Sequence, residues 1–292
     1  MSDQNCEVLI IGAGPVGLIG AIDLAQRGID VLVIDQRINY DPLTVRCNHI
    51  SSRSMEIFRR LGFVETVREG GFNETFPHDV SIRLTTTGTE IGRIKIPSRQ
   101  GRQLGERGPD GWWPTLEPPH RMNQIFLEPI LQKIAQETQG LEIKFDQKAL
   151  EVGDEGDHVK TTVRSSDGEE RQIKSQYLIG CDGGGSFVRK SIGGQLEGDA
   201  VIQRVQSSFI HAPGLTDMMQ AEPCWAVLNL NPRRSGTIYT IDNADRFLVH
   251  NYLRPGEEFD TLDRDENLRI ILGVNDSFDY TLLGNEDWIG RR

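Results

Sequence analysis

The chain has few cysteines for its 292 residues, and the four it contains are Cys6, Cys47, Cys181 and Cys224. They lie far apart, and none forms a CxxC pair or has the Cys/His spacing of a zinc site. The sequence therefore indicates neither a disulfide framework nor a metal centre. We expect reduced thiols and no bound metal.

Long apolar runs and an excess of basic residues are also missing. No stretch approaches the roughly 20 apolar residues that cross a bilayer, and the first residues lack the basic region and hydrophobic core of a signal peptide. Acidic residues number 43 against 32 basic ones, which gives a net charge of −11 and does not favour nucleic-acid binding. We expect a cytoplasmic protein with no nucleic-acid or membrane partner.

Glycine is abundant, and its first cluster carries the strongest signal in the chain. Gly12, Gly14 and Gly17 follow the strand-like run 7–11 and open a helix expected at 15–27. In such a pattern the first glycine makes a tight turn, the second lets backbone N–H groups approach a pyrophosphate, and the third lets helix and strand pack closely. The sequence predicts a dinucleotide-binding turn, with a glycine-rich structural turn as the alternative.

A second strand-like run, 30–35, ends in Asp35. A carboxylate at this position can accept hydrogen bonds from a ribose diol and would repel a 2′-phosphate. The site is therefore predicted to bind FAD or NAD in preference to NADP. Strand, glycines, helix, strand and acid occur in the expected order, which is more specific than the glycines alone.

Apolar periodicity and turn residues predict the remaining elements. Helices are expected at 51–61, ending at Gly62, and at about 123–138, where Pro129 should cause a local kink. The expected strands are a hairpin within 78–97, then 141–145, 149–152, 159–163, 173–179, 203–211, 225–230, 237–241 and 247–253. Trp112 and Trp113 lie in an irregular segment that is either a mobile lid or a cover over a seam between domains.

A second glycine turn follows the strand expected at 173–179. Asp182 precedes three consecutive glycines, Gly183 to Gly185. Such a run loses much conformational entropy on folding, so a close approach of the backbone to a partner explains it better than a structural turn alone.

These segments together resemble a known family. Gly12 to Gly17 with Asp35, RSMEIFRRLG at 53–62 and GCDGGGSFVRK at 180–190 resemble the FAD-dependent aromatic hydroxylases of the para-hydroxybenzoate hydroxylase and phenol hydroxylase type. The resemblance extends over essentially the whole chain. It implies an α/β fold, with a Rossmann-like FAD-binding domain and an inserted antiparallel β-sheet substrate domain. The expected limits are 1–77 and 98–195 for the FAD domain, 78–97 and 196–285 for the sheet domain, and 286–292 for a return to the FAD domain.

The resemblance also implies site residues. Arg46 is similar to a family arginine that reaches toward the flavin, and Arg121 and Gln124 lie in a segment similar to one that contacts FAD. Asp182 and Gly183 match a pair placed between FAD and a passing nicotinamide cofactor. Each of the three side chains Arg46, Arg121 and Gln124 has an ordinary solvated or capping role as its alternative. The full implied set is Gly12, Gly14, Pro15, Val16, Gly17, Asp35, Gln36, Arg46, Arg121, Gln124, Asp182 and Gly183.

The implied activity is hydroxylation of a phenolic or polyketide-like aromatic compound by an FAD-dependent monooxygenase, with NAD(P)H and O₂, through a C4a-hydroperoxyflavin. No residue is identified as catalytic. His211, Tyr239, His250 and Tyr252 are possible substrate contacts or ordinary strand residues. A homodimer is expected from the family only.

The chain departs from the family pattern at its end. A third motif, a Gly-Asp pair that opens a long helix, is expected to bind FAD and is absent, and Gly153-Asp154, Gly156-Asp157 and Gly198-Asp199 are not in the right order to replace it. We therefore expect a fragment, a mispredicted product or a shortened protein. Two alternatives to the hydroxylase stay open, a flavin oxidoreductase that does not hydroxylate and a non-catalytic nucleotide-binding remnant.

Overall fold

The computed structural model describes residues 4–38, 45–109, 115–199 and 201–291. The chain forms two compact units, one of Met1–Leu43 and Ile125–Leu196, the other of Thr44–Gln124 and Glu197–Arg292. Compactness alone does not show which residues serve which function, so the predicted limits of the FAD and substrate domains stay a prediction. The segment with Trp112 and Trp113 lies outside the described residues.

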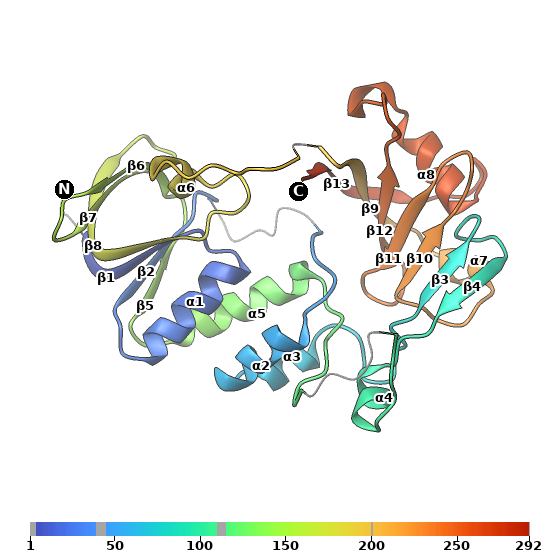
Figure 1. Cartoon of the computed structure of the whole chain (residues 1–292), viewed down its shortest axis with the longest axis horizontal. Coiled ribbons are helices and arrows are strands. Elements are labelled where there is room, and N and C mark those ends of the chain that lie inside the picture. The colour runs from blue at the N-terminus through green and yellow to red at the C-terminus, as the bar shows by residue number, and fades with distance from the viewer. Residues whose placement is uncertain (1–3, 39–44, 110–114, 200, 292) are drawn as a thin grey trace. The chain divides into compact units, whose positions relative to one another are not determined.

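The first unit is built on a six-stranded sheet in the order β5-β2-β1-β8-β7-β6 (Figure 1). Its strands are β1 (Gln4–Ile11), β2 (Val31–Ile34), β5 (Leu141–Lys144), β6 (Lys148–Asp154), β7 (Val159–Arg164) and β8 (Glu170–Gly180). β1 pairs in parallel with β2 on one side and β8 on the other, and β2 pairs in parallel with β5. β6, β7 and β8 pair antiparallel. The sheet is therefore parallel where it carries the glycine turns.

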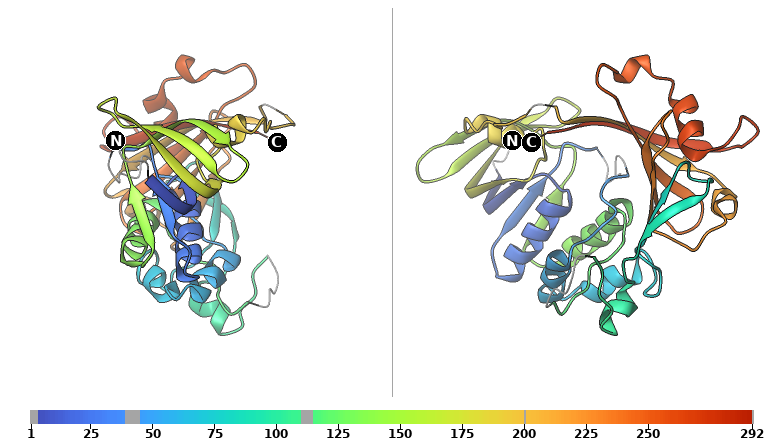
Figure 2. Two further views of the ribbon diagram at one scale, coloured as in Figure 1. Left: turned by 90° about the vertical axis from the view of Figure 1, so that its left-hand side faces the viewer. Right: turned by 45° about the vertical axis from the view of Figure 1, so that its right-hand side comes forward.

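Both faces of the parallel strands are covered, as their nearly unbroken apolar sequences require. Helices α1 (Pro15–Gln26) and α5 (Gln124–Glu137) lie side by side on one face (Figures 1 and 2). On the other face Leu9 and Leu32 belong to a buried cluster with Val163 of β7 and Val188. This cluster joins the antiparallel strands to the parallel core and holds the carboxyl ends of the strands in place.

The second unit contains a seven-stranded sheet in the order β13-β9-β12-β11-β10-β3-β4. Its strands are β3 (Val80–Arg83), β4 (Glu90–Ile94), β9 (Gln203–His211), β10 (Ala226–Asn229), β11 (Gly236–Thr240), β12 (Arg246–Tyr252) and β13 (Thr281–Gly290). Neighbouring strands are antiparallel except β10 and β3, which are parallel. The predicted hairpin at 78–97 thus joins the later strands in one sheet.

One face of this second sheet forms the core of the unit. Val227, Ile238 and Val249 point to that face and pack with Leu268 and Ile271 of helix α8. The helices of this unit are α2 (Ser52–Arg60), α3 (Val64–Glu69), α4 (Arg99–Gln103), α7 (Leu215–Met219) and α8 (Arg264–Leu272), with a 3-10 turn at Phe259–Thr261. Because side chains alternate along a strand, the residues between the core positions line the opposite face.

The predicted mixed α/β fold is confirmed, and the main elements lie within a few residues of their expected limits. Helix α2 begins after Ser51, whose side chain accepts a hydrogen bond from the backbone of Ser54, and Gly62 follows its end with a φ of +89°. Helix α5 runs through Pro129. Helix α8 and strand β13 were not predicted. Their apolar positions are interrupted by charged residues that pair only in the folded structure, as Arg264 does with Asp287.

Candidate cofactor site and aromatic face

The glycine turn between β1 and α1 is closed by contacts that leave no room for a side chain. Gly12 has a φ of +110°, and a Cβ on it would lie 2.4 Å from the backbone oxygen of Cys181. A Cβ on Gly17 would lie 1.9 Å from the backbone oxygen of Gly12. The first and third glycines are therefore required for a tight turn and for close packing of the helix.

The middle of the turn is open. A Cβ on Gly14 would meet no atom within 4 Å, and no side chain caps the helix at this residue. Pro15 occupies the start of α1, and Val16 is 73% exposed although it is apolar. An uncapped helix N-terminus beside open space suits a phosphate group, because its backbone N–H groups and the helix dipole both favour an anion. The residues present therefore fit the pyrophosphate of FAD.

The carboxylate of Asp35 is held inside the protein. Its Oδ2 accepts hydrogen bonds from the backbone N of Ala13 at 2.8 Å and from Nη2 of Arg37 at 3.1 Å, and its Oδ1 accepts from the backbone N and Nε of Arg37 at 2.9 and 3.0 Å. A carboxylate has about four acceptor positions, so all are in use. Ribose binding by Asp35 stays a prediction, and it requires some of these bonds to be exchanged. Gln36, beside it, is exposed.

Arg37 links three parts of the first unit. Besides Asp35, its guanidinium donates to the carbonyl of Ala13 at 3.0 Å and to Oε2 of Glu128 on α5 at 3.2 Å. Because this cation neutralises Asp35, repulsion of a 2′-phosphate by Asp35 is weaker than the sequence suggests. Arg37 is not among the predicted site residues, although a cation two residues after the acid was the available signal.

The second glycine turn adjoins the first. The backbone N of Gly12 donates to Ile34 at 2.8 Å, and that of Cys181 donates to Ile11 at 2.7 Å. Thus the carboxyl ends of β2, β1 and β8 lie next to one another, with connections leaving β1 on both sides. In open α/β sheets such a switch point is where ligands bind.

Asp182 has a structural function in this turn. Its carboxylate accepts hydrogen bonds from Oγ of Ser186 at 2.6 Å and from the backbone N of Phe187 and Val188 at 2.6 and 3.1 Å. These bonds hold the start of the short helix α6 (Phe187–Ser191). Gly183 has a φ of +81° and open space around its missing Cβ. Contact of Asp182 and Gly183 with a cofactor stays a prediction.

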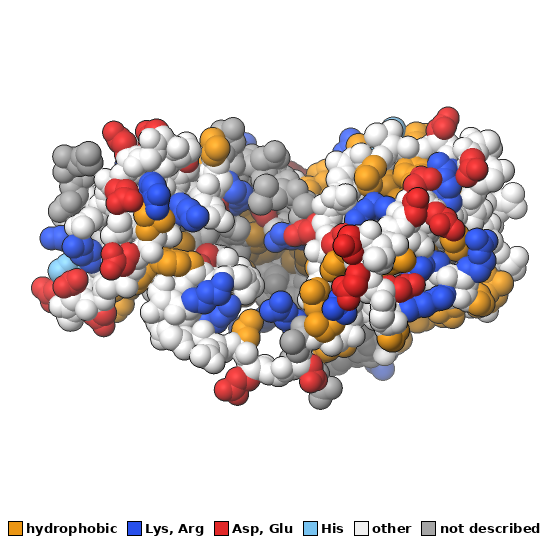
Figure 3. Space-filling view, turned by 90° about the horizontal axis from the view of Figure 1, so that it is seen from above, with side chains coloured by type: hydrophobic (Ala, Val, Ile, Leu, Met, Phe, Trp, Pro, Cys, Tyr) orange, Lys and Arg blue, Asp and Glu red, His pale blue; other side chains and the backbone are white. Residues whose placement is uncertain are grey.

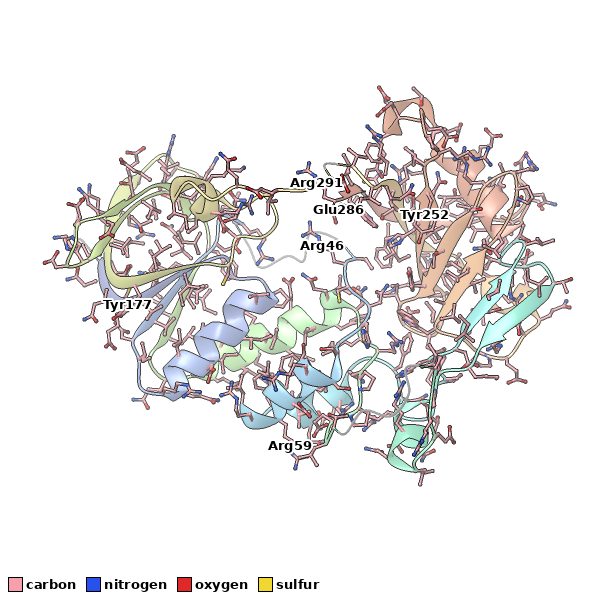
Figure 4. All side chains as sticks on the ribbon, in the orientation of Figure 1. Arg46, Arg59, Tyr177, Tyr252, Glu286 and Arg291 are labelled. Carbon is pink, nitrogen blue, oxygen red and sulfur yellow. The ribbon has the colours of Figure 1, made fainter. Side chains whose placement is uncertain are left out.

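The three other predicted FAD contacts lie in the second unit. Arg46 donates through Nε to Glu286 of β13 at 3.0 Å and makes a second bond to it through Nη2 (Figure 4). The carbonyl of Arg46 accepts from Nδ2 of Asn123 at 2.7 Å. The backbone N of Gln124 donates to the carbonyl of Cys47 at 3.0 Å. These bonds bring residues around 46 and 124 together, and contact of Arg46, Arg121 and Gln124 with FAD stays a prediction.

Arg121 begins a row of stacked side chains on the second sheet. Its guanidinium lies 3.6 Å from the ring centre of Trp225. The Trp225 ring is 5.1 Å from that of Tyr239, which is 5.4 Å from His250, and His250 is 5.7 Å from Trp288 of β13. This face is opposite the one that packs on α8. Two of the four predicted substrate contacts, Tyr239 and His250, thus lie side by side.

The other two predicted contacts have partners. The hydroxyl of Tyr252 shares a 2.9 Å hydrogen bond with Thr237, and Nε2 of His211 is 2.8 Å from the carboxylate of Asp245. Burial shifts the pKa values of Tyr239 and His250. It raises the pKa of Tyr239 to about 12 and lowers that of His250 to about 4. At neutral pH both groups are therefore uncharged.

The remaining features of the described residues are their surface charge, helix hydrophobicity, metal-binding groups and cysteines. Acidic and basic side chains are interspersed over both units on the face drawn in Figure 3. Within the described ranges no helix is long and apolar enough to span a bilayer, and no cluster of three or more His, Cys, Asp or Glu side chains could hold a metal ion. All four cysteines are free thiols.

A family model described as FAD binding domain matches residues 5–272, a range that includes both glycine turns. The chain belongs to this family. Its relatives are FAD-dependent monooxygenases and aromatic hydroxylases, so the predicted family and the predicted FAD cofactor are confirmed.

Two curated relatives show the range of the family. The FAD-dependent monooxygenase apdD of Emericella nidulans is 27% identical over 284 residues, which are 91% of this chain and 44% of the relative. The 2,4-dichlorophenol 6-monooxygenase of Cupriavidus pinatubonensis is 32% identical over 193 residues, which are 66% of this chain and 31% of the relative. The chain thus spans less than half the length of these two relatives.

Solved structures agree on the fold. A ternary complex of aklavinone-11 hydroxylase with FAD and aklavinone superimposes with a TM-score of 0.86 at 23% identity, over 100% of this chain and 54% of that one. The rebeccamycin biosynthetic enzyme RebC with reduced flavin gives 0.84 at 25% identity, over 99% of this chain and 53% of that one. A Rossmann-like FAD domain with a substrate-binding sheet domain is therefore the fold of this chain.

Proposed function

We propose that this protein takes part in the hydroxylation of a phenolic or polyketide-like aromatic compound, with NAD(P)H and O₂ as co-substrates. The balanced reaction joins one oxygen atom of O₂ to the aromatic ring, while NAD(P)H supplies two electrons that reduce the other atom to water. FAD, when bound, supplies the redox chemistry of this exchange. The open glycine turn at Gly14, beside an uncapped helix, carries the proposal.

The chain's own residues would bind the cofactor and orient the substrate. Backbone groups at Gly14 to Gly17 would hold the pyrophosphate, and Arg37 with Asp35 would shape the neighbouring ribose position. Gly183 leaves its side of the turn open for close approach by a ligand. The aromatic face of the second sheet offers a flat, mostly apolar surface for a flat substrate, and a bound substrate would help to exclude water, which promotes side reactions of reactive intermediates. The names of the relatives, which include a dichlorophenol monooxygenase, support an aromatic substrate.

Two measurements test this function. The first is a visible absorption spectrum of the 292-residue protein titrated with FAD, where bound flavin should give peaks shifted from those of free FAD. The second is NAD(P)H oxidation with a panel of phenols under ¹⁸O₂, followed by mass analysis of the products. Phenol-stimulated oxidation with one labelled oxygen in the product supports the proposal.

Other outcomes separate the alternatives. Bound FAD and NAD(P)H oxidation without labelled product would identify a flavin oxidoreductase that does not hydroxylate. A protein that stays colourless and unaffected by added FAD would be a nucleotide-binding remnant at most, and the proposal would fail for this chain.

A further inference from the structure

The residue between the first two glycines of the first turn is held through both of its backbone polar groups. The N–H of Ala13 donates to Oδ2 of Asp35 at 2.8 Å, and the carbonyl oxygen of Ala13 accepts from Nη2 of Arg37 at 3.0 Å. Ala13 itself is fully buried. Two side chains that follow β2 therefore fix the two peptide planes that meet at Ala13.

The plane between Ala13 and Gly14 matters for the open part of the turn. In a trans peptide the C=O and the N–H point in opposite directions. Because Arg37 holds the carbonyl of Ala13, the N–H of Gly14 points away from Arg37. It lies at the uncapped start of α1, where an anion is favoured and where a Cβ on Gly14 would meet nothing within 4 Å. Rotation of this plane would replace the N–H by a carbonyl oxygen, which repels an anion.

Arg37 is fixed in turn by a carboxylate from a distant part of the chain. Its Nη1 donates to Oε2 of Glu128 at 3.2 Å, and Glu128 lies on α5, 91 positions later. The side chain of Glu128 is buried and that of Arg37 nearly so. Burial disfavours the charged form of Arg37, but hydrogen bonds to Asp35 and Glu128 outweigh it and raise the pKa of Arg37 above its ordinary value. The guanidinium is therefore charged and held on two sides.

From these contacts we infer that Glu128 is a positioning residue for the phosphate site of the first glycine turn. It acts through Arg37, which fixes the carbonyl of Ala13 and with it the direction of the Gly14 N–H. The inference rests on the proposed binding of FAD at this turn and deepens it, because it names a residue outside the glycine pattern that controls how tightly a pyrophosphate binds.

The sign of the effect separates this role from simple electrostatics. A carboxylate near a pyrophosphate repels it, so by charge alone the loss of Glu128 would strengthen binding. A positioning role has the opposite consequence. Without support from Glu128, Arg37 has more freedom, and the Gly14 N–H that it orients is less well aligned with a bound phosphate.

The test is calorimetric titration of the 292-residue protein with ADP and with adenosine, which has the same base and ribose but no phosphate. The ratio of the two affinities therefore measures the phosphate site by itself. We expect the unsubstituted protein to bind ADP about a hundred-fold more tightly than adenosine, since the added contacts are charge-assisted hydrogen bonds.

Two substitutions of Glu128 separate contact from charge. Glu128→Asp keeps the charge but is one methylene shorter, so its carboxylate loses contact with Arg37, and the affinity ratio should fall about ten-fold. Glu128→Gln removes the charge but keeps an oxygen that accepts from Nη1 of Arg37. Its ratio should stay within about three-fold of the unsubstituted value and should not rise above it. Charge repulsion alone would give the reverse, with no change in Glu128→Asp and a raised ratio in Glu128→Gln.

The control variant changes the same charge on the same helix. Glu137 is exposed in the last turn of α5, so Glu137→Gln should leave the affinity ratio unchanged. A general loss of structure would weaken ADP and adenosine alike and so would not lower the ratio. If Glu128→Asp failed to fold, as seen by urea unfolding, Glu128→Gln would decide alone, because a raised ratio contradicts positioning.

Three results would overturn the inference: ADP bound no more tightly than adenosine by the unsubstituted protein, an unchanged ratio in folded Glu128→Asp, or a raised ratio in Glu128→Gln. Failure of the proposed function is seen separately, since these titrations need no turnover. The expected ratios without oxygenated product would contradict the proposed function alone. Phenol hydroxylation with an unchanged ratio in Glu128→Asp would contradict the inference alone.

Discussion

The surfaces for which we propose ligands are of different kinds in the two units. In the first unit the surface is made of backbone, at Gly12, Gly14 and Gly17 and at Gly183 to Gly185, and it is defined by the absence of side chains. In the second it is made of aromatic and neutral polar side chains on one sheet face. A backbone site constrains its sequence wherever a Cβ would collide with neighbouring backbone, as at Gly12 and Gly17. A side-chain surface accepts many sequences, so it can change with substrate while the cofactor site stays the same.

The largest effect should come from a methyl group in the backbone site. Gly17→Ala places a Cβ against the backbone oxygen of Gly12, which cannot move aside as a side chain would. We expect a loss of about 3 kcal/mol or more in the free energy of unfolding, and loss of FAD binding. Urea unfolding and FAD titration measure both.

The control for that variant lies in the same helix. Gly20→Ala adds a Cβ that meets nothing within 4 Å, and should stabilise the protein by about 0.5 to 1 kcal/mol. If the two alanines had similar effects, the backbone of the turn would be more adaptable than the structure indicates.

The next largest effect should follow removal of the Arg37 charge. Arg37→Gln removes a cation from beside the carboxylates of Asp35 and Glu128 in a largely buried setting, where side-chain exposure is 11% and 4%. We expect a loss of about 3 kcal/mol in unfolding free energy. Arg27→Gln, which breaks an exposed pair with Asp23 on α1, should cost less than about 0.5 kcal/mol. Equal costs would show that Arg37 does not hold the cofactor turn.

Acid should weaken the second unit through its buried histidines. Burial, with smaller contributions from cations such as Arg121 and Arg68, lowers the folded-state pKa of His78 to about 3 and that of His120 to about 4, from an ordinary value of 6.5. The unfolded chain therefore takes up protons first. Stability is unaffected by these groups above pH 6.5 and falls as the pH drops toward 4, by roughly 2 to 3 kcal/mol for each.

This pH dependence can be assigned to one unit. All four tryptophans lie within the sequence of the second unit, so their fluorescence during urea unfolding reports on it. The unfolding midpoint should fall between pH 7 and pH 4. His78→Leu should flatten part of that fall, because leucine does not take up a proton in the unfolded chain. The substitution breaks no hydrogen bond at Nδ1 of His78, which is buried without a partner. An unchanged profile would mean that other groups govern the acid response.

The smallest effect should come from a conservative change on the aromatic face. Arg121→Lys keeps the positive charge but loses the flat contact with Trp225, and should cost about 1 kcal/mol. FAD titration of the same variant tests the separate prediction that Arg121 contacts the cofactor. A large loss of FAD binding with unchanged stability would favour the cofactor role over the stacking role.

How far the sequence could predict the site depends on the kind of contact. Gly12 and Gly17 could be assigned their roles from spacing alone, because backbone geometry at a strand-to-helix turn is the same in many proteins. The hydrogen bonds of Asp35 could not be predicted from spacing. Most of them come from Arg37, two residues later, whose side chain folds back onto the carboxylate. Contact of Asp182 with a ligand stays a prediction, and what only the structure shows is that its carboxylate accepts hydrogen bonds from the Ser186 hydroxyl and from the backbone N–H groups that begin α6.

The sequence by itself determined the βαβ order, the two glycine turns and the acids that belong to them, Asp35 and Asp182, because these follow from local backbone requirements. Only the tertiary structure decided that residues 225, 239, 250 and 288 form one aromatic row and that Arg46 pairs with Glu286 across 240 positions of chain. The physical reason is strand pairing. Register between distant strands sets which side chains become neighbours, and that register depends on the packing of the whole sheet.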